Sequence, residues 1–108
     1  MRIQGPAKLL LIFIDETDTW GDAREPLYEA IAEKFFELGI DGVTVNSGIM
    51  GFGANRSLHK KRLFGVTDDR PVTIFVIESE DRLRAAIPSV RPMVKEGILF
   101  LLDGEVVA

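Results

Sequence analysis

KLLLIFI, the stretch from Lys8 to Ile14, decides the fold, because the apolar residues after the lysine follow one another without interruption. A strand with one face in water alternates apolar and polar residues, whereas a short unbroken apolar run indicates a strand that is buried on both faces. The runs VTIFVI, from Val72 to Ile77, and ILFLL, from Ile98 to Leu102, have the same character. We therefore expect three strands that are apolar on both faces.

Helical spacing of apolar residues separates these runs. Pro26 suits the first turn of a helix, because its missing N–H costs nothing there, and the pattern predicts a first helix over about 25–38. Ser79 is a suitable N-cap for a second helix, and two acidic residues follow it in the first turn. Pro88 and Pro92 are expected to bend or divide that second helix.

A short β-branched strand at Val43 to Val45 completes the order β-α-β-β-α-β. This order is typical of an α+β, ferredoxin-like fold, in which both helices cover one face of an antiparallel sheet. The other apolar face then needs a partner, and a second copy of the chain is the simplest one. We expect a homo-oligomer, and the alternative is a monomer with an exposed apolar sheet. Asp103-Gly104 predicts a turn after the last strand.

The composition limits the classes of function. A chain of 108 residues with 46% hydrophobic and 28% charged residues is expected to form one domain, 1–108. It has no cysteine, which excludes disulfides, thiolate zinc sites and cysteine nucleophiles. Its net charge of −4 argues against a nucleic-acid partner. The apolar runs are too short for membrane insertion or a signal peptide, so we expect a cytoplasmic protein.

The segment 46–70 follows neither the strand nor the helix period and is expected to be a long functional loop. Gly48, Gly51 and Gly53 permit close backbone approach, and successive amides in such turns can bind an anion. Four bases and no acid lie between Arg56 and Arg62, while the rest of the chain has nine bases and seventeen acids, a balance of −8. This pattern suits a small phosphate ligand. The alternative, from local chemistry alone, is a solvated hairpin tip.

The same residues resemble a known family. The segment Gly51-Phe52-Gly53-Ala54-Asn55-Arg56 is similar to the base of the T-loop in PII signal-transduction proteins, and Lys95-Glu96-Gly97-Ile98 is similar to the loop before their last main strand. A closer resemblance is to the PII-like family called domain of unknown function 190, or uncharacterised protein family 0166. It is carried over nearly the whole chain by Pro26-Leu27-Tyr28, the run Gly42 to Gly53, His59 and Pro71-Val72. Ser47 departs from the pattern, because the family often has an arginine there.

The resemblance implies a homotrimer whose sheets pack inward, with a regulatory role. PII-like proteins bind adenine nucleotides at clefts between subunits and change the conformation of the T-loop, which alters the activity of a partner. It implies AMP, ADP, ATP or cyclic AMP as the ligand, no required cofactor, and a membrane transporter or an enzyme as the regulated partner. The nucleotide contacts carried over by position are Gly48, Gly51, Phe52, Gly53, Arg56, His59, Glu96 and Gly97.

Other functions remain open from the residues. His59, the single histidine, is either a ligand contact or a solvated loop residue, and with nearby carboxylates it would suit a CutA-like metal-binding or stress-response trimer. The carboxylates from Asp15 to Asp22 could hold Mg²⁺, but we favour a solvated loop and predict no metal site. Trp20 is expected to pack against the protein. No catalytic residue is predicted, because no acid is placed to orient His59; a small enzyme acting on a phosphorylated substrate is the remaining alternative.

Overall fold

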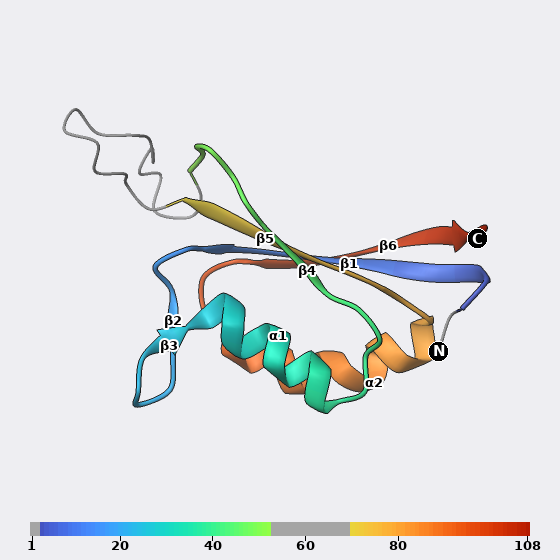
Figure 1. The fold of residues 1–108 in the computed structure, drawn as a ribbon, viewed down its shortest axis with the longest axis horizontal. Helices are drawn as coiled ribbons and strands as arrows, with labels where there is room; N and C mark the ends of the chain where they lie inside the picture. The colour runs from blue at the N-terminus through green and yellow to red at the C-terminus, as the bar shows by residue number, and fades with distance from the viewer. Residues whose placement is uncertain (1–2, 53–69) are drawn as a thin grey trace.

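The computed structural model describes residues 3–52 and 70–108. Its main sheet is antiparallel and has the strand order β4-β5-β1-β6, formed by β1 (Gly5–Asp15), β4 (Thr44–Ser47), β5 (Pro71–Glu78) and β6 (Ile98–Val106). The helices α1 (Leu27–Glu37) and α2 (Glu80–Val90) both lie on one face of this sheet (Figure 1). The predicted α+β class and β-α-β-β-α-β order are therefore confirmed.

The core forms between the helices and the inner face of the sheet. Alternate residues of β1 and β5 point inward, and Leu10, Ile12 and Ile74 are almost completely buried there. They pack against Ile31 and Phe35 of α1 and against apolar residues of α2. Each helix buries only one stripe of side chains, so both helices cover this face and neither is available to cover the opposite face.

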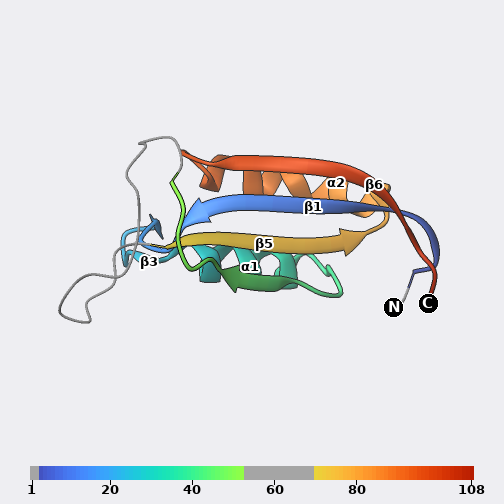
Figure 2. The same cartoon turned by 90° about the horizontal axis from the view of Figure 1, so that it is seen from above.

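The opposite face of the sheet, here called the open face, is also apolar. Cross-strand pairing aligns Leu9 with Leu102 and Leu11 with Phe100, and directly opposed residues share a face. Both helices lie behind the sheet when it is viewed from this side (Figure 2), so neither covers it. The open face consists of Leu9, Leu11, Phe13, Phe75, Ile77, Ile98, Phe100 and Leu102. The expectation of strands that are apolar on both faces is confirmed.

Three local features refine the predictions. Ser79 caps α2 as predicted, with its Oγ accepting a hydrogen bond from the Arg82 amide at 3.4 Å. Pro88 lies inside α2 and does not divide it; a 3-10 turn, η1 (Arg91–Met93), containing Pro92, follows directly. A hairpin of β2 (Thr19–Trp20) and β3 (Glu25–Pro26), which we did not predict, precedes α1.

The predicted turn at Asp103-Gly104 is wrong, because β6 continues through both residues. Asp103 pairs with Lys8 across the strands, and Gly104 pairs with Ala7. The Lys8 ammonium also forms an ion pair with the Asp103 carboxylate. Pairing along the full length of β1 outweighs the local preference of this dipeptide for a turn.

No helix in the described ranges has both the length and the apolar character needed to cross a membrane.

Candidate functional site

The predicted contact residues lie on two loops at the same end of the sheet. Ser47, at the end of β4, pairs with Val72 near the start of β5, and Phe13, near the end of β1, pairs with Ile98 at the start of β6. The base of the 46–70 segment, here called the glycine segment, and the loop before β6 therefore leave the same end of the sheet (Figure 1). Two strands lie between them within one chain, so three strand spacings, or about 14 Å, separate β4 from β6.

Gly48 and Gly51 form the base of the long segment by packing around Pro71. The Gly48 amide donates a hydrogen bond to the Pro71 carbonyl at 2.7 Å. A Cβ atom would lie 2.8 Å from the Pro71 Cγ at position 48 and 3.2 Å from it at position 51. A side chain at position 48 would therefore require Pro71 to shift, while one at position 51 would be a tight contact, and the Gly48 amide is already hydrogen-bonded within the chain. Phe52 is exposed beside them.

Three of the predicted contacts, namely Gly53, Arg56 and His59, lie outside the described residues.

In the second loop, Glu96 is exposed and Gly97 is closely packed. A Cβ atom at position 97 would overlap the carbonyl oxygen of Phe13 and would lie 2.9 Å from the Val94 Cγ1. Glycine at this position thus allows the loop to run directly over β1 before β6 begins.

We expect Gly97→Ala to destabilise the fold by about 3 kcal/mol, the upper end of the usual cost of overpacking, because the displaced atom belongs to the backbone. Chemical denaturation would measure this change in the free energy of unfolding. Gly104→Ala is the matched control, since a Cβ atom there meets nothing within 4 Å. Equal stability of the two variants would contradict this prediction and show that the loop moves away from the Phe13 carbonyl at little cost in free energy.

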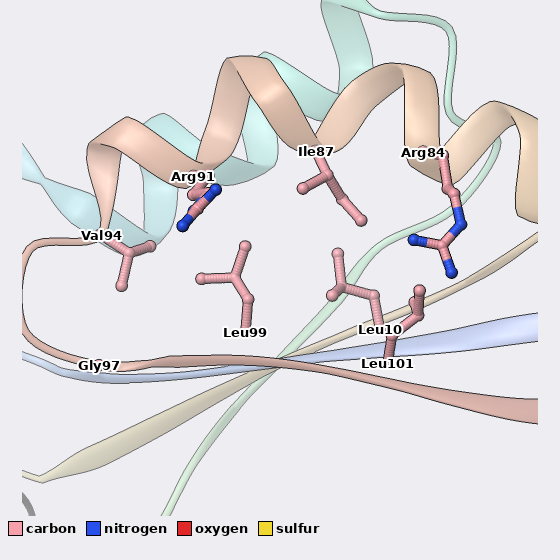
Figure 3. A pocket seen from close by; sticks show the side chains of 8 residues that line it. All are labelled: Leu10, Arg84, Ile87, Arg91, Val94, Gly97, Leu99 and Leu101. Atoms are coloured by element: carbon pink, nitrogen blue, oxygen red, sulfur yellow. The ribbon is translucent and has the colours of Figure 1, made fainter.

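A cavity of about 480 Å³ lies between α2 and β6, beside Gly97 (Figure 3). Its floor is apolar, and two arginines, Arg84 and Arg91, project from α2 and η1 on the cavity side. Sequence reasoning missed both arginines, although their spacing of seven residues places them on one helical face. The cavity is lined by Leu10, Arg84, Ile87, Arg91, Val94, Gly97, Leu99 and Leu101.

The charges at the Arg84 end of this cavity are paired. The Arg84 Nε donates to the Glu80 Oε2 at 2.7 Å, and this bond, together with the Lys8 charge, lowers the pKa of Glu80. The hydrogen bond and charge of Lys8 likewise lower the pKa of Asp103, to which the Arg84 charge also contributes. Two cations and two carboxylates thus balance one another at this end.

The carboxylates of Asp15, the last residue of β1, and of Asp18 accept hydrogen bonds within their own loop. The Asp15 Oδ1 accepts hydrogen bonds from the amide and the hydroxyl of Thr17, at 3.1 and 3.2 Å, and the Asp18 Oδ2 accepts from the Asp15 amide at 3.0 Å. Such contacts are typical of Asx turns. Within residues 3–52 and 70–108, no group of three or more histidine, aspartate or glutamate residues could hold a metal ion. Trp20 packs against the core, as expected.

Comparison with other sequences places the chain in a family. The model of DUF190 (Uncharacterized ACR, COG1993) matches residues 7–106. A UPF0166 protein of Aquifex aeolicus (strain VF5) is 29% identical over 100 residues, which cover 93% of this chain and 92% of the relative. A second UPF0166 protein of the same organism is 36% identical over 61 residues, covering 56% of this chain and 64% of the relative.

Comparison with solved structures supports the fold. CPII of Thiomonas intermedia K12, a nitrogen regulatory PII-like protein bound to ADP, AMP and bicarbonate, has a TM-score of 0.70 at 19% identity, covering 95% of this chain and 90% of CPII. CPII bound to ADP and bicarbonate has a TM-score of 0.67 at 20% identity, with the same coverage. The chain thus has a PII-like fold and belongs to the DUF190, or UPF0166, family.

Proposed function

We propose that this protein is a cytoplasmic, PII-like regulatory module that binds an adenine nucleotide at clefts between the subunits of a homotrimer. The nucleotide, AMP, ADP, ATP or cyclic AMP, would bind at the glycine base of the 46–70 segment, and this segment would transmit the signal to a membrane transporter or an enzyme. The observation that carries the proposal is that both predicted contact loops leave the same end of the sheet. CPII, a protein of similar fold, has been solved with ADP and AMP bound.

The apolar open face supports the proposed trimer. Its large side chains include Phe13, Phe100 and Ile98, which are 41%, 50% and 58% exposed in the single chain. A contiguous apolar surface of this kind marks an interface, and packing three sheets together would remove it from water. Such packing would also bring the glycine base of one subunit near the second loop of the next. The cleft between subunits is therefore the proposed site.

The proposed role is ligand binding without turnover. The carboxylates after β1, which would be natural ligands for Mg²⁺ beside a nucleotide, accept hydrogen bonds from their own loop instead. Nucleotide hydrolysis usually needs such a metal and a positioned water molecule. The nucleotide then acts through its binding free energy, which can favour one conformation of the loop over another.

Calorimetric titration and thermal denaturation of the full chain with each of the four nucleotides test this function. A nucleotide at 100 times its Kd should stabilise the protein by about 2.7 kcal/mol per site. We expect Gly53→Glu and Arg56→Glu to abolish binding, because each places a carboxylate in the segment proposed to contact the anionic nucleotide. The matched controls are Gly42→Glu, where a Cβ atom meets nothing within 4 Å, and Arg24→Glu in the β2–β3 turn. Absence of binding by all four nucleotides at millimolar concentration would refute the proposal.

A further inference from the structure

The cavity between α2 and β6 presents cations above an apolar floor. Arg84, Ile87 and Arg91 occupy positions i, i+3 and i+7 and therefore share one side of the helix. In Figure 3, the Arg84 guanidinium points toward Leu101, and Arg91 lies at the other end of the cavity, on the side of Val94 and Leu99. The Cα atoms of the two arginines are about 10 Å apart along the helix axis, so their side chains start from different ends of the cavity.

The two arginines differ in their partners. Arg84 is held by Glu80 at 2.7 Å, in the balanced cluster that also includes Lys8 and Asp103. Arg91 has no ion pair or side-chain hydrogen bond to any other residue among those the structure describes. The uncompensated positive charge of the cavity is therefore at the Arg91 end, next to Val94 and Gly97.

The size and lining of the cavity fit one end of a nucleotide. Its volume of about 480 Å³ lies within the range of roughly 300–1,000 Å³ that is usual for small-molecule sites. A guanidinium can form two parallel hydrogen bonds to a phosphate, and the floor of Leu10, Leu99 and Leu101 offers an apolar surface for a ring. Gly97, a predicted contact residue, lies at the same end as Arg91.

We infer that Arg91 binds the phosphate group of the nucleotide in the cavity between α2 and β6. This inference rests on the proposed function and assigns a phosphate-binding residue that lies outside the glycine segment. Arg84 remains paired with Glu80 and closes the far end of the cavity.

Titration of the full chain with AMP and with adenosine tests the inference, since the two ligands differ only in the phosphate. We expect Arg91→Gln to weaken AMP binding at least tenfold and to leave adenosine binding unchanged, because only the phosphate loses its partner. Arg91→Lys should restore part of the AMP affinity, since it keeps the charge but loses the two-pronged contact. Arg24→Gln, which removes an exposed arginine in the β2–β3 turn, is the control and should change neither affinity.

Unchanged AMP affinity in Arg91→Gln would overturn the inference, and so would an equal loss of AMP and adenosine affinity, which indicates a structural role. Inorganic pyrophosphate separates this failure from that of the proposed function. If the native chain binds pyrophosphate, Arg91→Gln loses this binding and no adenine nucleotide binds, the anion site at Arg91 is supported and the proposed nucleotide function is refuted. If the native chain binds neither pyrophosphate nor any of the four nucleotides, both fail.

Discussion

Phe100→Glu is expected to reduce the mass in solution from about three chains to that of a single chain, 12.0 kDa. Phe100 is 50% exposed on the open face and pairs with Leu11 on the neighbouring strand. In the proposed trimer this position is enclosed by apolar side chains from three copies. A carboxylate buried there without a partner carries a large desolvation penalty, which association of the subunits cannot offset.

Light scattering measures the mass, and circular dichroism shows whether the dissociated variant is still folded. Phe36→Glu is the matched control, because Phe36 is 83% exposed at the end of α1, on the helical side of the molecule. This variant should keep the mass of the native protein. A native mass of 12.0 kDa, or a Phe100→Glu variant that still associates, would contradict the sheet-to-sheet trimer.

The sequence was sufficient to predict the main elements, because their signals are local. The unbroken run from Lys8 to Ile14 forms the middle of β1, and Ser79 caps α2. The predictions fail where residues far apart in the sequence determine the local structure. Asp103 would form a turn in isolation, but Lys8 holds it in β6. Each strand of the β2–β3 hairpin has only two residues, which is too short for an alternation of apolar and polar residues to be recognised in the sequence.

The candidate site was less predictable, because its residues come together only through the sheet order. The glycines could be identified from the sequence. The need for glycine at position 97, however, arises from the nearby carbonyl of Phe13, which belongs to a strand far away in the sequence. Arg91 could not be distinguished from other surface arginines, since its significance depends on the apolar floor that β1 and β6 place beneath it. The contacts assigned to Gly53, Arg56 and His59 stay predictions.

Arg82→Met is expected to lower the free energy of unfolding by about 3 kcal/mol, the lower end of the cost of removing one partner of a buried ion pair, because Glu78 is buried while the Arg82 side chain is 34% exposed. Glu78 is only 1% exposed, and its Oε1 lies 3.4 Å from the Arg82 Nη1. Its other oxygen accepts a hydrogen bond from the Ser79 amide at 3.1 Å. Arg82 also forms an ion pair with Asp41, 3.4 Å away, and donates to the Gly39 carbonyl, so it links the end of α1 to the start of α2.

The double variant Arg82→Met/Glu78→Met should recover much of this loss, because no charge is then left buried and methionine fills irregular space well. The comparison separates two causes of the loss of stability, the unpaired charge of Glu78 and the missing contacts of Arg82 to Asp41 and Gly39. Those contacts are absent from both variants, so only the effect of the buried charge differs between them. Arg84→Met is the control: it breaks the exposed pair with Glu80, which contributes far less to stability. Urea denaturation of all four proteins measures the differences. If the double variant is no more stable than Arg82→Met, the link between the helices, and not the burial of Glu78, is what Arg82 contributes.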